Sequence, residues 1–207
     1  LTNIFRVQEL RSRILYTVLA ILIYRIGSHI PTPGIDPTAL LEFLSSAQGG
    51  GGLLTIMDLF SGGALFRFSI LALGIMPYIS ASIIMQLLGV VIPALERMQK
   101  EGESGRKKIN QYVRYLALVL CIIQSAAMAS WIQSINEGAM IYMKPGLGFV
   151  LIVVATATAG TMFLMWLGDQ ITERGLGNGI SVIIFAGIVA RIPAGVYDMI
   201  QKKDSEY

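Results

Sequence analysis

The sequence LGIMPYISASIIMQLL, residues 73–88, combines an uncharged apolar run with a glycine and a proline. It lies within residues 68–95, a charge-free stretch longer than the roughly 20 residues needed to cross the hydrocarbon of a bilayer. Gly74 and Pro77 are expected to weaken or kink a helix here, because the proline nitrogen has no proton to donate. Kinked helices often line cavities, and proline is also common in ordinary membrane spans. The stretch therefore predicts a kinked membrane helix.

The composition of the whole chain is that of an integral membrane protein. Of its 207 residues, 54% are hydrophobic and 14% are charged, and the mean hydropathy is +0.65. Soluble domains carry about 25% charged residues, so this chain lacks the ionic surface of a water-facing globule. Arg25 interrupts the first candidate span but lies near its end, where an arginine can reach the headgroups. We predict five spans, at residues 14–30, 68–95, 115–136, 145–168 and 175–197.

Basic residues gather on alternate connections between these spans. Three arginines lie in the N-terminal segment, and six lysines and arginines lie in residues 97–114. The positive-inside rule puts both segments in the cytoplasm, and we expect the short loop 169–178 there too. An odd number of spans is typical of one half of an inverted repeat, a plan in which the second half has the opposite topology. The chain is therefore expected to be half of a larger structure.

Residues 48–65 form an unusual segment between the first two spans. A run of glycines at 49–52 and the sequence Ser61, Gly62, Gly63 flank an apolar stretch. The pattern predicts a helix of two or three turns within residues 53–65, too short to cross the membrane and hinged by glycine at both ends. One interpretation is an interfacial helix on the outer surface, which composition alone favours. The other is a mobile or re-entrant element, which at membrane depth must be surrounded by protein or a water-filled cavity.

The sequence offers little for catalysis or metal binding. Cys121 and His29 are the single cysteine and the single histidine, so an internal disulfide and a cysteine-based metal cluster are excluded, and zinc or histidine chemistry is poorly supported. Carboxylates do not occur deep in any charge-free span, which removes a proton relay or an intramembrane aspartyl protease. Residues 175–179, GLGNG, lack the Gly-Lys-Ser/Thr of a phosphate loop and predict a turn. No enzyme activity, metal or cofactor is predicted.

Several side chains within the spans are open to two interpretations. Isoleucines recur four residues apart at 75 and 79 and again at 180 and 184, so each pair shares a helix face. By spacing alone, such pairs face lipid or pack against helices more often than they line a pore. Gln86 and Gln124 are notable polar groups in apolar surroundings. Each can bond a neighbouring helix or mark a polar seam where helices part.

Five stretches together resemble the SecY family of protein-conducting channels. They are GSHIPTPGID at 27–36, FSGGAL at 60–65, LGIMPYISASIIMQLL at 73–88, KEGESGRKKINQYVRY at 100–115 and GTMFLMWLGDQITERGLGNGIS at 160–181. They follow one another in the family order without gaps and run through nearly the whole chain. The resemblance implies an all-α polytopic membrane protein with five transmembrane helices and a short re-entrant plug helix. That fold is the N-terminal half of a ten-helix, inverted-repeat clamshell.

The resemblance also assigns roles to residues of this chain. The pore ring it implies consists of Ile75, Ile79, Ile180 and Ile184. The plug it implies contains Leu53, Leu54, Ile56, Met57, Leu59, Phe60, Gly62 and Gly63. Gln86 and Gln124 fall in the wall of a lateral gate. The cytoplasmic basic loop contains Arg97, Lys100, Arg106, Lys107 and Lys108, which either meet a ribosome or acidic protein or simply fix the topology.

The function implied is passage of unfolded secretory polypeptides across the membrane, with release of apolar segments into lipid through the lateral gate. An apolar ring binds no ion and fits loosely around a sliding chain of any sequence. The partners implied are SecE, SecG, the SecA ATPase or a ribosome, signal sequences and nascent chains. The location implied is the bacterial plasma membrane, with a cytoplasmic N-terminus. We expect the C-terminal half of the channel to be a separate chain, or this chain to be a truncated product.

Two other classes of protein are weaker alternatives. Half of a secondary transporter for small solutes would explain the glycine and proline breaks and the parity of the spans. Such a transporter needs a polar or ionic site at the midplane, for which these spans offer few groups. An enzyme ranks third, because no nucleophile and base are paired in the sequence.

Overall fold

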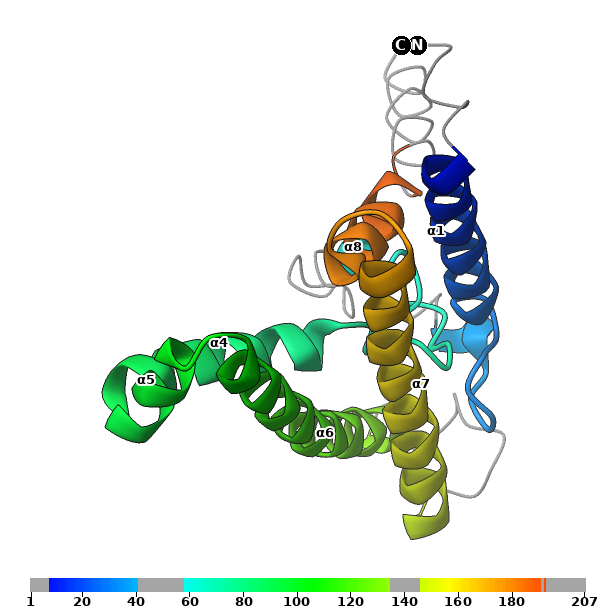
Figure 1. The fold of residues 1–207 in the computed structure, drawn as a ribbon. Helices are drawn as coiled ribbons and strands as arrows, with labels where there is room; N and C mark the ends of the chain where they lie inside the picture. Colours follow the sequence, from blue (N-terminus) through cyan, green and yellow to red (C-terminus); the bar gives the residue numbers. More distant parts are fainter. Residues whose placement is uncertain (1–7, 41–57, 135–145, 191, 193–207) are drawn as a thin grey trace, which may run out of the picture.

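The computed structural model describes residues 8–40, 58–134, 146–190 and 192 (Figure 1). Within these residues the expected all-α fold is confirmed, and an isolated β-bridge joins Pro31 to Ser69. The helices are α1 (Gln8–Gly27), α4 (Met76–Val91), α5 (Pro93–Lys100), α6 (Glu103–Ser134), α7 (Leu147–Arg174) and α8 (Gly179–Val189). The helix α7 is central, because α1, α6 and α8 all pack against it, while α4 packs against α6.

The prediction of one kinked helix over residues 68–95 is wrong in two respects. Residues 61–75 form successive turns, and α4 begins only at Met76, with Pro77 in its first turn. Proline suits that position, since the first helical N–H groups have no partner within the helix. The sharp break comes later, at Ile92, where α4 and α5 differ in direction by 103°. Ile92 is extended because the ring of Pro93 disfavours helical geometry in the residue before it.

The expected loop over residues 97–114 is also wrong, because most of it is helical. The helix α5 runs to Lys100, and α6 begins at Glu103 after a turn in which Gly102 has a φ of +76°. Two pairs four residues apart, Glu96 with Lys100 and Glu103 with Lys107, support these helices by about 0.2–0.5 kcal/mol each. The basic residues of this segment indicate a connection outside the membrane. They do not indicate a loop, because Glu–Lys pairs four residues apart also stabilise a helix.

Other helix bounds differ more modestly from the expected spans. The first helix occupies Gln8–Gly27 rather than residues 14–30. The helix α7 continues to Arg174, so the loop expected at 169–178 shrinks to a turn over residues 175–178. Gly175 ends α7 by donating its N–H to the carbonyl of Ile171 at 2.7 Å. The helix α8 begins at Gly179, and the residues expected in its span beyond 192 lie outside the described part of the chain.

Among the described residues, α6 and α7 are each long and apolar enough to cross a membrane, and α4 with α5 makes a third if the bent pair is one span. The helix α8 is apolar but has 11 described residues, and α1, with three arginines, does not meet the combined requirement of length and apolar composition.

Large apolar side chains lie exposed on α1, α4, α6, α7 and α8: Leu15, Leu22 and Ile26 on α1, Leu87 and Val90 on α4, Ile123 on α6, Leu151 and Trp166 on α7, and Phe185 on α8. Water does not tolerate so much exposed apolar surface, and a bilayer does. The protein is a membrane protein.

Small residues set the closest approaches between the elements. A Cβ atom at Gly160 of α7 would collide with the carbonyl of Ile70, and one at Gly179 of α8 would collide with the carbonyl of Gly168. The turns 61–75 and the start of α8 therefore lie directly against the backbone of α7. Ala81 and Ala117, both fully buried, form a similar close seam between α4 and α6. These contacts fix the position of the site described next.

Candidate pore and hinge site

The four isoleucines expected at the pore pack into one apolar cluster. Ile75 precedes the first turn of α4 and is buried, and Ile79 lies one turn further on. Ile180 and Ile184 lie on successive turns of α8 and, like Ile79, are half-buried. The buried residues of the cluster come from α1, α7, α8 and the turns before α4: Ala20, Tyr24, Leu71, Ile75, Leu164, Leu167, Ile171 and Ile183. Two isoleucine pairs that lie about one hundred residues apart in sequence thus share one apolar environment.

The segment at Ser61 and Gly62 lies beside this cluster, in a slot between α1 and α8. The hydroxyl of Tyr24 donates a hydrogen bond to the carbonyl of Ser61 at 3.0 Å. The guanidinium of Arg25 donates to the carbonyl of Gly62 at 3.2 Å. A Cβ atom at Gly62 would lie 2.9 Å from the Tyr24 hydroxyl and 3.0 Å from the Cα of Gly187 on α8. Three elements therefore meet at a residue whose φ of +67° favours glycine.

The same segment is held together internally by Asp58, which is fully buried. One carboxylate oxygen of Asp58 accepts the N–H of Phe66 at 2.9 Å and the hydroxyl of Ser61 at 3.4 Å. The hydroxyl oxygen of Ser61 in turn accepts the N–H of Leu65 at 3.1 Å. A single acidic side chain among apolar neighbours thus shapes the turn that follows it.

The expected plug helix over residues 53–65 is described only in part. Leu53, Leu54, Ile56 and Met57 lie outside the described residues. Helical conformation is present at residues 58–60 and ends there, because Gly62 and Gly63 both have positive φ and turns follow. The helix thus ends where the sequence places the second glycine-rich boundary, and the assignment of residues 53–65 to a plug stays a prediction. Leu59 and Phe60 expose much of their apolar side chains.

The two glutamines expected at a lateral gate lie on neighbouring helices, and no hydrogen bond joins them within the described residues. Gln86 is exposed on α4 and donates to the hydroxyl of Ser82 on its own helix at 3.4 Å. Gln124 is half-buried on α6. The contact between these helices is instead apolar, with Met85 of α4 and Val113 of α6 in the same cluster. The assignment of Gln86 and Gln124 to a polar seam at a lateral gate stays a prediction.

The basic residues lie exposed on α5 and on the first turns of α6. Two of them are engaged locally: Lys100 contacts Glu96 at 2.6 Å, and Lys107 contacts Glu103 at 2.9 Å. The hydrogen bond from Lys100 holds the pKa of Glu96 below its usual value, because it favours the ionised carboxylate. The other expected members, Arg97, Arg106 and Lys108, are also exposed.

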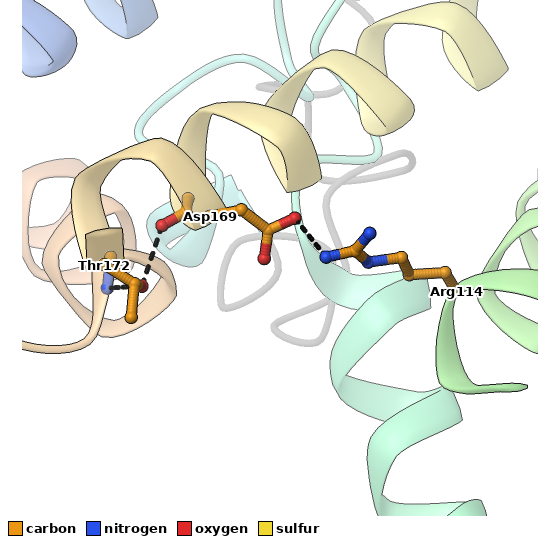
Figure 2. Close-up of polar contacts among 5 residues, drawn as sticks. Arg114, Asp169 and Thr172 are labelled. Atoms are coloured by element: carbon orange, nitrogen blue, oxygen red, sulfur yellow. Dashed lines mark hydrogen bonds and ion pairs between the residues drawn. The ribbon is translucent and has the colours of Figure 1, made fainter. Parts of the chain in front are cut away.

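A separate ion pair ties α6 to α7 next to this basic surface. Figure 2 shows the guanidinium of Arg114 directed at the carboxylate of Asp169, at a distance of 2.7 Å. One turn beyond Asp169, the hydroxyl of Thr172 donates to the carbonyl of Gly168 at 2.9 Å and accepts the N–H of Gly179 at 2.8 Å. Gly179 begins α8, so this hydroxyl joins two consecutive helices. The region is built from fixed polar contacts, in contrast to the apolar cluster beside it.

Sequence reasoning missed four residues of this site: Tyr24, Arg25, Asp58 and Gly187. Arg25 and Asp58 carried a usable signal, because a charged side chain in an apolar stretch requires a partner. From the sequence, the side chain of Arg25 is expected to reach the lipid headgroups. In the structure its guanidinium donates a hydrogen bond to the backbone carbonyl of Gly62. Among the described residues, no three histidine, cysteine or acidic side chains gather in a way that could hold a metal ion.

These features define a polytopic helical membrane protein with an apolar cluster beside a glycine-containing turn at Gly62 and Gly63. Residues 69–206 match the family model described as SecY, and the chain belongs to the SecY family. The resemblance found in the sequence is thereby confirmed.

Curated relatives agree with this assignment. The chain is 51% identical over 205 residues to the protein translocase subunit SecY of Aquifex aeolicus, a match that covers 98% of this chain and 47% of the relative. It is 53% identical over 194 residues to the protein translocase subunit SecY of Escherichia coli K12, covering 94% of this chain and 43% of that protein. The chain thus spans about half the length of the curated relatives it matches.

Solved structures share the fold. One, described as the structure of a protein conducting channel, has a TM-score of 0.63 at 20% identity and covers 90% of this chain and 38% of that chain. A second, Sec61 in the canine ribosome-channel complex from the endoplasmic reticulum, gives the same score, identity and coverage. At this identity the likeness concerns the arrangement of the helices.

Proposed function

We propose that this chain forms half of the central pore of a protein translocase, which passes unfolded secretory polypeptides across the membrane. The observation that carries the proposal is the apolar cluster shared by Ile75, Ile79, Ile180 and Ile184, in a chain of the SecY family. Curated relatives of this chain are named as subunits of a protein translocase. The chemistry is physical and not covalent, so the protein is not proposed to be an enzyme.

The four isoleucines are proposed to form this chain's share of the pore ring. An apolar constriction offers no ligand to an ion and can lose its water, so it resists leakage at rest. It also offers no specific hydrogen bonds, so polypeptides of any sequence can slide through it. Ile79, Ile180 and Ile184 are half-buried within this chain, which leaves apolar surface for the other half of the pore to complete.

Residues 53–65 are proposed to be the plug that closes this pore at rest. The described end of the segment supports the proposal, because Gly62 and Gly63 adopt positive φ and form a hinge next to the isoleucine cluster. A hinge of this kind lets the preceding residues move as a unit while α4 stays in place. Removal of the plug is expected to raise the resting ion conductance.

The helix α4 is proposed to be one wall of a lateral gate through which apolar segments enter the lipid. Exposed apolar residues on α4, among them Ile83 and Leu87, suit contact with a signal sequence or with lipid. Transfer of apolar surface from water to lipid is favourable by roughly 25 cal/mol per Å². Gln86 and Gln124 are proposed to mark the polar side of that gate, where a closed channel meets water.

The proposed partners are the C-terminal half of the channel, SecE, SecG, and either the SecA ATPase or a ribosome, together with signal sequences and nascent chains. The exposed basic residues of α5 and α6 support a cytoplasmic position for that end of the molecule. The proposed location is the bacterial plasma membrane, crossed several times, with the N-terminus in the cytoplasm.

The decisive experiment is photo-crosslinking from Ile79 in the assembled channel. A photoreactive residue at position 79 should form an adduct with a secretory polypeptide stalled during transport. The control is Leu151 on α7, which is 67% exposed and is assigned to neither the pore nor the gate, so lipid adducts should predominate there. Absence of a polypeptide adduct at position 79, with protection of that position by a small solute, would instead favour a solute transporter.

A further inference from the structure

Two consecutive backbone carbonyls of the hinge receive hydrogen bonds from two consecutive side chains of α1. The Tyr24 hydroxyl lies 3.0 Å from the carbonyl oxygen of Ser61, and the Arg25 guanidinium lies 3.2 Å from the carbonyl oxygen of Gly62. Neighbouring residues on a helix point about 100° apart, so the two donors approach the adjacent carbonyls from different directions. The Tyr24 side chain is 2% exposed and Arg25 is half-buried, so neither is a surface contact.

The slot that receives the hinge has no spare room. A Cβ atom at Gly187 would lie 3.0 Å from the Tyr24 hydroxyl, 3.2 Å from the carbonyl oxygen of Phe60 and 3.4 Å from the nitrogen of Gly62. The Tyr24 hydroxyl therefore touches both walls of the slot and the hinge itself. Because the accepting groups are backbone carbonyls, the contact depends on the path of the hinge and not on its side chains.

Departure of the hinge from the slot would leave buried polar groups without partners. A backbone carbonyl or a hydroxyl in apolar surroundings needs a hydrogen bond, and a guanidinium needs one more strongly. The bonds from α1 are therefore present when the hinge occupies the slot and are lost when it leaves. An interaction made in one of two states shifts the population toward that state.

We propose that Tyr24 and Arg25 are positioning residues that latch the plug hinge against α8 and so hold the resting channel closed. This inference rests on the proposed function, in which residues 53–65 block the pore. The latch acts on the hinge and not on the polypeptide being transported. Its loss should raise leakage at rest and leave the path through the open pore unchanged.

The test measures the resting conductance of the assembled, full-length channel in planar bilayers. Tyr24→Phe removes the hydroxyl and keeps the ring, and it should raise resting conductance about three- to tenfold, the factor for one lost hydrogen bond. Arg25→Met should raise it about tenfold or more, because a charged donor is lost, and Arg25→Lys should restore much of the closure. The matched control is Tyr16→Phe, which removes the hydroxyl that reaches Gln170 of α7 at 3.5 Å and should leave conductance unchanged.

Two further measurements keep the outcomes distinct. Deletion of residues 53–60 tests the plug itself: unchanged leakage after this deletion would contradict the proposed function. Increased leakage after the deletion, with no increase in Tyr24→Phe and Arg25→Met, would overturn the latch alone. The thermal stability of the assembled complex is the third readout. If the two latch variants lose stability as far as they gain leakage, and Arg25→Lys does not restore closure, the residues are structural and the proposal fails.

Discussion

The buried face of α1 holds two glycine-containing segments in contrasting ways. Thr17 and Tyr24 lie on that face two turns apart. The hydroxyl of Thr17 donates to the carbonyl of Arg13 at 2.9 Å and accepts the N–H of Leu176 at 3.1 Å, in the turn between α7 and α8. Tyr24, by contrast, donates to the hinge at Ser61. One helix face therefore contacts a turn fixed between two helices and a hinge that leads to the proposed plug.

The difference lies in which bonds fix the position of each segment relative to α8. The turn is closed at both ends by short-range bonds: Thr172 accepts the N–H of Gly179 at 2.8 Å, and Asn178 accepts the N–H of Ser181 at 3.2 Å. The hinge has its internal bonds to Asp58, but its position relative to α8 depends on bonds from α1, 37 residues away in sequence. A change in the turn should therefore lower stability, whereas a change in the hinge should alter closure.

The largest effect is expected from Gly179→Val, which tests whether the turn is rigid. The new Cβ would meet the carbonyl of Gly168, and both groups belong to helices that cannot easily move apart. Overpacking of this kind costs about 1–3 kcal/mol or more, so we expect a clear fall in the thermal stability and yield of the assembled channel. The matched control is Gly148→Val, where no atom lies within 4 Å of the new Cβ. Equal stability of the two variants would contradict the comparison.

A smaller effect on stability, and a larger one on closure, is expected from Gly62→Ala in the hinge. The positive φ costs a residue with a side chain about 1–2 kcal/mol, and the new Cβ would crowd Tyr24 and Gly187. In the proposed latch, the hinge leaves its slot when the channel opens, so opening should relieve this strain, and resting conductance should rise about tenfold with little loss of assembly.

The control for this variant is Gly102→Ala, which has the same kind of backbone strain at a φ of +76° but no atom within 4 Å of the new Cβ. It should lower stability slightly and leave conductance unchanged. A rise in conductance in Gly102→Ala, or none in Gly62→Ala, would show that the hinge and the rest of the chain do not differ in the way proposed.

Much of the fold could be predicted from the sequence, because membrane helices need long apolar stretches. The error over residues 61–75 has a physical reason. Those turns are as buried and apolar as a helix, so composition does not separate the two. Most of their backbone bonds close short, irregular turns, and two join a distant segment: Ile70 donates to the carbonyl of Ile30 at 2.9 Å, and Thr32 donates to the carbonyl of Phe68 at 2.9 Å. Such pairing leaves no periodic signal in the sequence.

The site could be predicted only in part. The isoleucine pairs share faces by spacing, but their common cluster depends on how α4 and α8 approach α7, which only the family resemblance implied. Tyr24 and Arg25 could not be matched to Ser61 and Gly62, because the acceptors are backbone carbonyls that every residue carries. A charged residue in an apolar stretch indicates that a polar partner is needed, but its sequence position does not identify that partner.

The smallest effect is expected from Thr17→Val. This change removes the hydroxyl of α1 that bonds the turn between α7 and α8, and it leaves the bonds to the hinge intact. The N–H of Leu176 loses its acceptor, at a cost of about 1 kcal/mol, while the bonds from Thr172 and Asn178 remain. Thermal stability of the assembled channel should fall slightly, resting conductance should not change, and Thr17→Ser, which keeps the hydroxyl, should behave as the unmodified protein. An equal increase in leakage in Thr17→Val and Tyr24→Phe would contradict the comparison. It would show that closure depends on the whole buried face of α1 and not specifically on its bonds to the hinge.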